Sequence, residues 1–547
     1  MRAYRAEEIA EIVGGSVLAG DGSAEILRFS TDSREGDANT MFVPVIGGHA
    51  DAHDYIPDAY RHGMRAVFTS RGEALPGTPG MTYVGVEDNV AALQRFGAYI
   101  RDSLAVPVIG ITGSVGKTTT KEMIAAALET ELVILKTEGN MNSQVGVPRM
   151  LCRLEPEHQA AVIEMGMSEP GEMEKLAASA RPECAVMTNI GVSHIGQLGT
   201  KSNIRKEKLN IINEFPDGGT LFLNGDDPML AELAEMQLGL GNSWKAMSER
   251  SRERFEKARI VTFGLGEHCD YRAAGITVQN GRTVFRLHCP GDGGDYPGEV
   301  TLSVAGEHNV RNALAAIAVA AHYGVSPERA AEGLAGYEPI AMRGGKTEAD
   351  GVVLIDDTYN ASPDSMRGGI DILASTEAER RIAVLADMLE LGELSRACHE
   401  EIGRCAAERG VDLLVAVGSE ARYYAEAFDR QSEECAAAAE ETDFAAEPDF
   451  AEKPGRTGES DFVKEPNPAT EAEQRRESGR PGAAVCAGRG GRRQVHFDTN
   501  AEALEFLKRE LVRGDAVLFK GSRGMRLEEL VNGILQARTG QSGTRTE

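Results

Sequence analysis

The sequence lacks an apolar run long enough to cross a membrane. Its run Ala313–Ala321 is much shorter than the ~20 residues that a transmembrane helix needs. The first eight residues, Met-Arg-Ala-Tyr-Arg-Ala-Glu-Glu, also lack the apolar core of a secretory signal peptide. We therefore expect a cytoplasmic protein without a membrane-inserted segment.

Basic residues and paired cysteines are scarce as well. The 58 Lys and Arg residues are outnumbered by 85 Asp and Glu residues, which gives a formal net charge of −27. Nucleic acids and anionic membranes bind to basic surfaces, so this balance argues against either as a partner. The eight cysteines include no Cys-x-x-Cys pair, which predicts reduced thiols rather than a disulfide framework or a zinc site.

The length of 547 residues is sufficient for about three or four domains. We expect an α/β region at 1–103, a parallel-sheet α/β domain at 104–336 and a Rossmann-like α/β domain at 337–547. Residues 429–494 are rich in Glu, Ala, Pro, Gly and Arg and poor in aliphatic side chains. Such a composition buries too little apolar area to offset the entropy of ordering, so we predict a disordered insertion in the third domain.

Short apolar runs mark the strands of the two larger domains. The strands predicted for the middle domain are 108–112, 161–165, 184–188, 220–223 and 259–263. Those predicted for the third domain are 352–355, 381–385, 413–417 and 515–519, and 495–497 resumes the same domain after the insertion.

The segment with the most specific chemistry is Thr112-Gly-Ser-Val-Gly-Lys-Thr-Thr119, which stands between a predicted strand and an apolar-periodic helix. Glycines let backbone N–H groups converge on phosphate oxygens, and a helix N-terminus adds partial positive charge. Lys117 is expected to reach the β- and γ-phosphates, and the Thr118 hydroxyl to bind Mg²⁺. The segment therefore predicts a nucleoside triphosphate site, although Ile111 stands where the general pattern has glycine.

Polar residues also follow later strands of this domain, namely Glu164, Asn189 and His194. Ligands of open α/β sheets gather at the carboxyl ends of strands, so these residues are expected to face the phosphate loop. Glu164 suits Mg²⁺, which prefers oxygen ligands. Taken alone, His194 is more typical of a structural histidine, and Lys208 of a solvated helix face.

The first domain carries Ser30-Thr-Asp-Ser-Arg34 and, further on, His53-Asp54. Hydroxyls, an arginine and nearby glycine turns suit a phosphorylated or sugar ligand, and they are equally typical of surface turns. Both interpretations stay open on the residues alone.

Taken in order, these motifs resemble the Mur ligases, which are ATP-dependent amide ligases of peptidoglycan precursor synthesis. The resemblance is carried by Thr112–Thr119, Glu164-Met-Gly, Thr188-Asn with His194, Lys208, and Gly306-Glu-His-Asn-Val-Arg-Asn312. The loop of that family reads Thr-Gly-x-x-Gly-Lys-Thr, so it requires no glycine at Ile111. The resemblance covers the chain outside 429–494.

Within the family, the C-terminal motifs are similar to those of the members that add D-alanyl-D-alanine. These motifs are Asp356-Asp-Thr-Tyr-Asn-Ala-Ser-Pro-Asp-Ser-Met366, Leu385-Ala-Asp-Met-Leu-Glu-Leu-Gly-Glu393 with His399, and Lys520-Gly-Ser-Arg-Gly-Met525. One departure is Asn142-Ser-Gln144, where relatives often show Asn-Asn and then an acidic or amide residue.

The resemblance implies a three-domain Mur ligase architecture. Residues 1–103 would bind the UDP-sugar, 104–336 would be a central P-loop ATPase domain with a parallel sheet, and 337–547 would be a Rossmann-like ligase domain. The implied reaction transfers a phosphoryl group from ATP to the carboxylate of a UDP-N-acetylmuramoyl-tripeptide. The amine of D-alanyl-D-alanine then attacks the acyl phosphate.

Specific residues are implied for each part of this reaction. The catalytic set is Lys117, Glu164, His194, Lys208 and Arg343. The ATP contacts are Gly113, Ser114, Val115, Gly116, Lys117, Thr118 and Thr119, with Asn309 at adenine and Asp357 at ribose. Two Mg²⁺ ions are expected, held by Thr118 with Glu164 and by His194 with a carbamylated Lys208. The substrate contacts are Ser30, Ser33, Arg34, His53, Asn189 and Asn360.

Two other functions remain open, namely a different amino-acid ligase of the same family and a nucleotide-binding regulator without ligase chemistry. The C-terminal motifs disfavour the former, and the complete set of Lys117, Glu164, His194 and Lys208 disfavours the latter. A monomer is expected.

Overall fold

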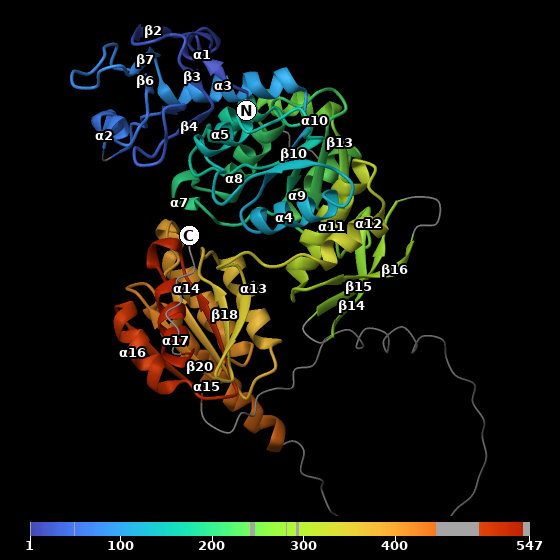
Figure 1. Ribbon diagram of the computed structural model, residues 1–547. Coiled ribbons are helices and arrows are strands. Elements are labelled where there is room, and N and C mark those ends of the chain that lie inside the picture. The colour runs from blue at the N-terminus through green and yellow to red at the C-terminus, as the bar shows by residue number, and fades with distance from the viewer. Residues whose placement is uncertain are drawn as a thin grey trace, which may run out of the picture. The chain divides into compact units, whose positions relative to one another are not determined.

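The computed structural model describes residues 2–48, 50–240, 247–279, 282–290, 295–444 and 492–539. They form two compact units. The first unit contains Met1–Arg343 together with Ser362–Gly368 and Leu389–Leu394, and the second contains Gly344–Ala361, Gly369–Met388 and the chain from Ser395 onward. Strands and helices alternate in both units, which confirms the α/β class (Figure 1).

The N-terminal part of the first unit is built on a five-stranded sheet in the order β2-β7-β6-β5-β4. Its strands are β2 (Ser16–Ala19), β4 (Arg28–Ser30), β5 (Thr40–Phe42), β6 (Ala66–Thr69) and β7 (Thr82–Gly85), and the short β1 (Tyr4–Arg5) pairs with β3 (Glu25–Ile26). Its helices are α1 (Ala6–Val13), η1 (Ala52–Tyr55), α2 (Ile56–Arg61) and α3 (Asn89–Leu104).

The rest of the first unit surrounds a nine-stranded sheet in the order β16-β15-β14-β13-β12-β11-β8-β10-β9. Its strands are β8 (Val108–Thr112), β9 (Ile134–Lys136), β10 (Ala160–Glu164), β11 (Cys184–Met187), β12 (Thr220–Asn224), β13 (Arg259–Gly264), β14 (Tyr271–Gln279), β15 (Arg282–His288) and β16 (Asp295–Leu302). The strands from β9 to β14 are parallel, and β14, β15 and β16 are antiparallel. The five predicted strands are confirmed within one residue at each end, whereas β9 and β14 to β16 were not predicted.

Helices cover both faces of this sheet. They are α4 (Lys117–Leu128), α5 (Gly146–Leu151), α6 (Glu172–Ala180), α7 (Ile195–Leu198), α8 (Lys201–Leu209), η2 (Asn210–Ile212), α9 (Pro228–Gln237), α10 (Glu249–Lys257), α11 (Glu307–His322) and α12 (Pro327–Ala335). Val108 belongs to the core on one face, while Ile109 and Ile111 belong to the core on the other. Such continuous apolar runs are typical of parallel strands that are buried on both faces.

The strand register brings the polar strand ends together. Thr112 at the end of β8 pairs with Met187 of β11, and Ile111 pairs with Glu164 of β10. Because these strands are parallel, the segments that follow them emerge at one edge of the sheet. The phosphate-loop sequence, Glu164 and Asn189 therefore lie at the same edge.

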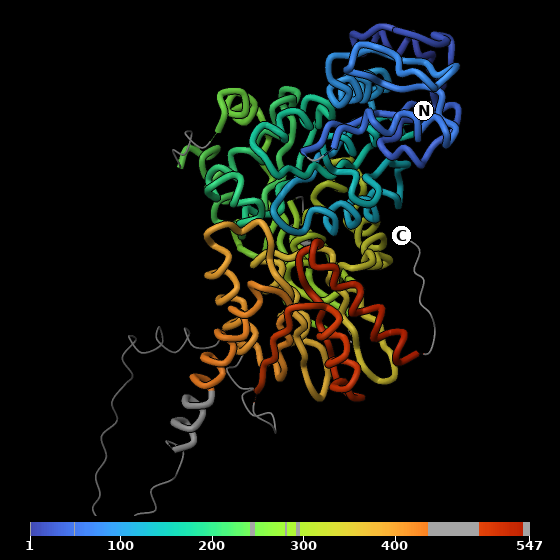
Figure 2. The backbone as a smooth tube through the Cα atoms, turned by 90° about the vertical axis from the view of Figure 1, so that its left-hand side faces the viewer, coloured from blue at the N-terminus to red at the C-terminus, as the bar shows by residue number. Residues whose placement is uncertain are grey.

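The second unit has a six-stranded sheet in the order β17-β18-β22-β19-β20-β21. Its strands are β17 (Gly345–Ala349), β18 (Val352–Asp357), β19 (Arg380–Ala386), β20 (Leu413–Val417), β21 (Arg493–Phe497) and β22 (Asp515–Lys520). The C-terminal β22 lies between β18 and β19. Figure 2 shows the red C-terminal segment beside the orange segments of the same unit. After the predicted insertion, β21 pairs in parallel with β20 and so joins the same sheet.

The helices after Arg343 are α13 (Pro363–Ala374), η4 (Gly392–Leu394), α14 (Ser395–Glu408), α15 (Arg422–Phe444), α16 (Asn500–Glu510), η5 (Arg523–Met525) and α17 (Glu528–Thr539). Of these, η4 and the first part of α13 belong to the first unit. Helix α15 continues past residue 429, where the predicted disordered insertion begins, as far as Phe444. Alanine and glutamate are strong helix formers, and their abundance in this stretch explains the difference. Residues 445–491 of the predicted insertion lie outside the described residues.

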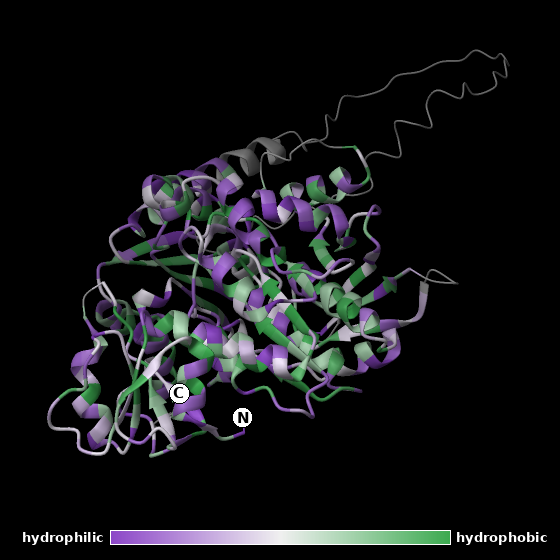
Figure 3. Cartoon of the chain, turned by 90° about the horizontal axis from the view of Figure 1, so that it is seen from above, coloured by the Kyte–Doolittle hydropathy of each residue, from purple (hydrophilic) through white to green (hydrophobic). Residues whose placement is uncertain are grey.

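Hydropathy follows this architecture. The strands are largely apolar, whereas polar residues cover the outer faces of many helices (Figure 3). Among the described helices, none is both long and apolar enough to span a bilayer. The seven cysteines within the described residues form no disulfide.

Candidate active site

The phosphate-binding loop lies between β8 and α4. Gly113 has a φ of +150°, and a Cβ atom there would lie 1.9 Å from the hydroxyl oxygen of Thr188, so only glycine fits. Gly116, with a φ of +83°, caps α4. The loop therefore leads directly into the positive end of the α4 dipole, which favours a phosphate ligand.

Asn189 holds this loop from the neighbouring strand end. Its side-chain oxygen accepts hydrogen bonds from the backbone N–H groups of Ser114 (3.1 Å) and Val115 (2.9 Å). The hydroxyl of Thr188 donates to the Val115 carbonyl at 2.5 Å. The structure thus places Asn189, a predicted substrate contact, against the loop backbone.

Two lysines converge on one carbonyl oxygen. Nζ of Lys117 donates to the Gly113 carbonyl at 2.8 Å, and Nζ of Lys208 donates to the same carbonyl at 3.0 Å. Burial lowers the pKa of Lys117, the charge of Glu164 opposes this, and the charge of Arg343 adds to it. Lys117 and Lys208 thus meet at the Gly113 carbonyl, and the charge of Arg343 acts on Lys117.

Lys208 is the more deeply buried of the two lysines. It lies on α8 and is only 1% exposed. Burial lowers the pKa of Lys208 well below its ordinary value, and the charge of Lys117 lowers it further. This shift moves the equilibrium of Lys208 toward the neutral amine, which is nucleophilic where an ammonium is not.

Glu164 ends β10 and is 1% exposed. Its Oε1 accepts a hydrogen bond from the Asn142 amide at 2.7 Å, and its backbone N–H donates to the Thr137 hydroxyl at 2.9 Å. Its Oε2 is buried and has no hydrogen-bond partner among the described residues. A buried carboxylate oxygen without a donor is costly, and a bound cation would satisfy it.

His194 precedes α7 and has a left-handed backbone with a φ of 61°. Burial lowers the pKa of its imidazole, the nearby carboxylate of Glu390 opposes this shift, and the charges of Lys117 and Lys208 add to it. The neutral ring, which is the form that binds metals, is therefore favoured.

The residues at this edge fit a magnesium ion at one position in particular. The unpartnered Oε2 of Glu164 is the hard oxygen ligand that Mg²⁺ prefers, and Thr118 is buried at the start of α4. No cluster of three or more His, Cys, Asp or Glu side chains suited to a metal occurs in the part of the chain that the structure describes. Each of the two predicted ligand sets includes a residue of another type, Thr118 or Lys208, and both sets stay predictions.

The predicted adenine contact, Asn309, lies in the first turn of α11. Its side-chain amide donates to the Ala305 carbonyl at 2.7 Å. The neighbouring Asn312 accepts a hydrogen bond from the Thr120 hydroxyl of α4 at 3.0 Å. This pair connects the start of α11 to the helix that follows the phosphate loop.

In the second unit, Lys520 joins two of the predicted ligand contacts. Its Nζ lies 2.6 Å from the carboxylate of Asp357, the predicted ribose contact, and donates to the carbonyl of Asn360 at 3.1 Å. Lys520 is 2% exposed, so this pair is largely shielded from solvent. The structure therefore brings Asp357 and Asn360 together through a lysine that the sequence analysis gave no role.

Among the four candidates of the N-terminal domain, Ser30 and Arg34 share Asp32 as a partner, whereas Ser33 and His53 bond to other residues. Ser30 donates to the Asp32 carbonyl, Ser33 donates to the Asp58 carboxylate, and Arg34 pairs with the Asp32 carboxylate. His53 is 0% exposed. Its Nδ1 lies 2.6 Å from the Asp51 carboxylate, and its Nε2 accepts from the Ser70 backbone at 3.2 Å. His53 is thus part of the core.

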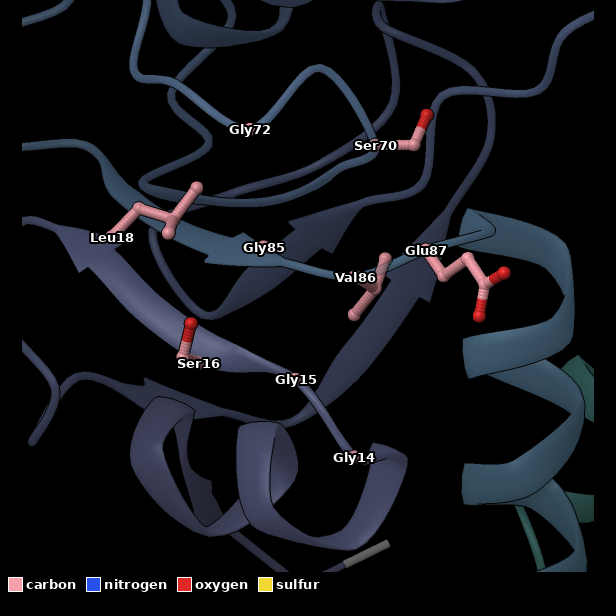
Figure 4. Close-up of a pocket in the computed structure, with 9 residues that line it drawn as sticks. All are labelled: Gly14, Gly15, Ser16, Leu18, Ser70, Gly72, Gly85, Val86 and Glu87. Carbon is pink, nitrogen blue, oxygen red and sulfur yellow. The ribbon is translucent and has the colours of Figure 1, made fainter.

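A pocket of about 350 Å³ opens near these residues, between the start of β2 and the end of β7. Figure 4 shows its polar side chains, Ser16, Ser70 and Glu87, among glycines and apolar groups. None of the four substrate candidates lines it.

Three further residues emerge only from the structure. Asn142 orients Glu164, Lys520 joins Asp357 to Asn360, and Glu390 lies beside His194. Each stands in a motif noted in the sequence, but a motif does not reveal which residue a side chain meets across the fold.

Comparison with known proteins agrees with this geometry. The Mur ligase middle domain matches residues 111–320, and the Mur ligase glutamate ligase domain matches residues 343–452. A UDP-N-acetylmuramoyl-tripeptide–D-alanyl-D-alanine ligase of Bacillus subtilis is 30% identical over 97% of this chain and 98% of its own length. The ligase of the same name from Synechocystis is 35% identical over 70% of this chain and 77% of its own length.

Solved structures show the same similarity. A crystal structure of MurF from Acinetobacter baumannii is 28% identical, with a TM-score of 0.77 over 98% of this chain and 99% of that one. MurF from Thermotoga maritima in complex with ADP has a TM-score of 0.70 over 94% of this chain and 98% of that one, and at 24% identity it supports the fold. The motifs, the site geometry and these matches establish that the chain belongs to the Mur ligase family.

Proposed function

We propose that this protein uses ATP to join D-alanyl-D-alanine to UDP-N-acetylmuramoyl-tripeptide. The observation that carries the proposal is the meeting of Lys117 and Lys208 at the Gly113 carbonyl. The charge of Glu164, whose Oε2 is buried without a partner among the described residues, acts on Lys117 there. A cluster of this kind suits phosphoryl transfer better than nucleotide binding alone. The names of the relatives that match most of the chain support the two substrates.

The proposed reaction has two steps. The terminal carboxylate of the tripeptide attacks the γ-phosphate of ATP, ADP leaves, and an acyl phosphate forms. The amine of D-alanyl-D-alanine then attacks the acyl carbon, and the tetrahedral intermediate releases phosphate. In the first step two anions must approach, so Lys117 and Arg343 would act by positioning and screening the negative charge.

Two Mg²⁺ ions complete the proposal. Thr118 and Glu164 would hold one ion, and His194 and a carbamylated Lys208 would hold the other. The ions would neutralise charge on the phosphate oxygens. The unpartnered Oε2 of Glu164 supports the first assignment, and the depressed pKa of the buried Lys208 amine supports the second.

Carbamylation would change the charge of Lys208. An ammonium repels a metal ion, whereas addition of CO₂ to the neutral amine, with loss of a proton, gives an anionic carbamate with two oxygen ligands. Activity is then expected to fall in CO₂-depleted buffer at mildly acidic pH and to recover with bicarbonate. Lys208→Ala is expected to be nearly inactive and to regain part of its turnover with acetate. Full activity of Lys208→Ala without acetate would contradict the assignment.

The remaining assignments are part of the same proposal. The domains are 1–103, 104–336 and 337–547. Ser30, Ser33, Arg34 and His53 serve the nucleotide-sugar region, Asn309 and Asp357 serve ATP, and Asn189 and Asn360 serve the peptide substrates. The enzyme is proposed to act as a cytoplasmic monomer.

One assay tests the function. Phosphate release is measured with ATP, Mg²⁺ and UDP-N-acetylmuramoyl-tripeptide, with and without D-alanyl-D-alanine. The proposal expects sustained release only when the dipeptide is present. Release that requires a different amino acid would indicate another ligase of the family, and no release with any acceptor would indicate a nucleotide-binding regulator.

A further inference from the structure

Two residues with unusual backbone conformations face each other within the first unit. His194 has a φ of 61° and Glu390 has a φ of 65°, and neither is glycine. Left-handed conformations are unfavourable for residues with a Cβ, and they persist where the surrounding structure enforces them, often at functional sites. The surrounding structure therefore holds both His194 and Glu390 in unfavourable backbone conformations, in which their side chains meet.

The contact joins the imidazole of His194 to the carboxylate of Glu390. Nδ1 and Oε2 are 2.7 Å apart. Nδ1 is buried, and the Glu390 carboxylate lies within hydrogen-bonding distance of it, so Oε2 of Glu390 is an acceptor for a proton on Nδ1. A backbone contact adds to the side-chain contact, because the N–H of Gly196 donates to the Glu390 carbonyl at 3.3 Å.

The segment that carries Glu390 is held at both of its ends. Leu389–Leu394 belongs to the first unit, whereas the flanking Met388 and Ser395 belong to the second. The buried ring of His399 contacts both flanking residues. Its Nδ1–H donates to the Ser395 carbonyl at 2.7 Å, and its Nε2 accepts from the Met388 N–H at 3.1 Å. One imidazole thus fixes the two points at which the segment leaves and re-enters the second unit.

We propose that Glu390 is a positioning residue that holds His194 in the Nδ1–H tautomer. The Nε2 lone pair is then the donor for a divalent metal ion. Histidines that bind metals commonly donate their other ring N–H to a carboxylate, which fixes the ring and strengthens the ligand. This inference rests on the proposed function, since it assigns His194 to a metal. It adds a residue from the Asp387-Met-Leu-Glu390 motif to the metal site.

Mn²⁺ binding tests the proposal without measuring turnover. Free Mn²⁺ is followed by electron paramagnetic resonance as enzyme is titrated in the presence of a non-hydrolysable ATP analogue. Glu390→Ala is expected to weaken one Mn²⁺ site about 10- to 100-fold. The matched control is Glu393→Gln, an exposed glutamate of the same segment, which is expected to bind Mn²⁺ as the wild type does.

The outcomes separate this inference from the proposed function. Wild-type affinity in Glu390→Ala would overturn the role of Glu390 and leave the ligase intact. An equal loss of Mn²⁺ affinity in Glu393→Gln would show that the affinity depends on the net charge of the segment. That result would also overturn the positioning role of Glu390. No enzyme-dependent Mn²⁺ site in the wild type would instead overturn the metal assignment of the proposed function.

Nitrogen NMR of ¹⁵N-histidine-labelled protein gives a second readout that needs no metal. His194 is expected in the Nδ1–H form in the wild type and in Glu393→Gln, and in the Nε2–H form in Glu390→Ala. His399 provides a reference in the same spectrum, because its two hydrogen bonds already require the Nδ1–H form. An Nε2–H tautomer of His194 in the wild type would contradict the proposal.

Discussion

The phosphate-loop region and the N-terminal substrate candidates use polar residues in opposite ways. Near Gly113, side chains from distant parts of the chain meet. Lys208 is desolvated beside another lysine, and Glu164 keeps an unsatisfied oxygen. In the N-terminal domain, Ser33 and His53 are paired with the carboxylates of Asp58 and Asp51.

This difference separates groups that are ready for a ligand from groups that are occupied by the fold. A buried polar group without a partner lowers stability and persists where function requires it, whereas a satisfied one contributes to stability. Substitutions near Gly113 should therefore reduce activity more than stability, and substitution of His53 should do the reverse.

The largest effect is expected for Lys117→Ala. Loss of a positioned cation at the transferred phosphoryl group should raise the barrier by about 4 kcal/mol or more, so that kcat falls about 1,000-fold, with the protein still folded. Phosphate release and thermal unfolding measure the two quantities. Lys201→Ala, which removes an exposed lysine at the start of α8, is the control. Near-normal turnover of Lys117→Ala would contradict the assignment of the phosphate loop to the active site.

Glu164→Gln sharpens the same comparison. The amide keeps one oxygen for Asn142 and removes the carboxylate oxygen that has no partner. We expect kcat to fall about 100-fold or more, while the metal-free protein is at least as stable as the wild type, as for other active-site residues that lower stability. Urea unfolding without Mg²⁺ tests the second part. Clear destabilisation would mean that Glu164 has a structural role instead.

The sequence predicted those features that depend on local pattern. The strand 108–112, the glycine turn and the helix that follows agree with the structure, because apolar periodicity and turn residues are local properties. The contact between Lys208 and Gly113 depends on how distant segments pack, and nothing in the residues around Lys208 distinguishes it from a solvated lysine. Likewise, the antiparallel β14–β16 extension lacks the long apolar runs of the buried parallel strands.

A smaller effect, on stability rather than catalysis, is expected for His53→Ala. The substitution leaves a buried cavity and removes one of the two side-chain partners of Asp51, the other being Arg71. It also leaves the Ser70 backbone N–H, which donates to Nε2 of His53, without that acceptor. The cost should be about 2–3 kcal/mol of unfolding free energy. Chemical denaturation provides the measurement, and His62→Ala is the control, since its side chain is 44% exposed. If His53→Ala leaves stability unchanged and raises the KM for the UDP-sugar, His53 serves the ligand rather than the fold.

The smallest expected effect concerns His399 and pH. Burial lowers the pKa of this imidazole, although its hydrogen bond to the Ser395 carbonyl and the charges of Asp387 and Glu420 oppose the shift. The unfolded chain, with an ordinary histidine pKa of about 6.5, therefore binds more protons than the folded protein just below that pH. The stabilisation is fully present above about pH 6.5 and is lost as the pH falls toward the lower pKa of the folded state.

The His399→Gln variant lacks this titration, so it isolates the contribution of one ring. Unfolding free energies are measured for both proteins between pH 7.5 and 5.5. The wild-type advantage should shrink on acidification by at most about 1.4 kcal/mol per pH unit, which is the limit for one proton. His194 and His322 also have pKa values lowered by burial, and both are retained in the variant, so the difference between the proteins cancels their slopes. A pH-independent difference would mean that His399 supports Met388 and Ser395 through packing alone. The contribution of His399 to the unfolding free energy would then not depend on its protonation.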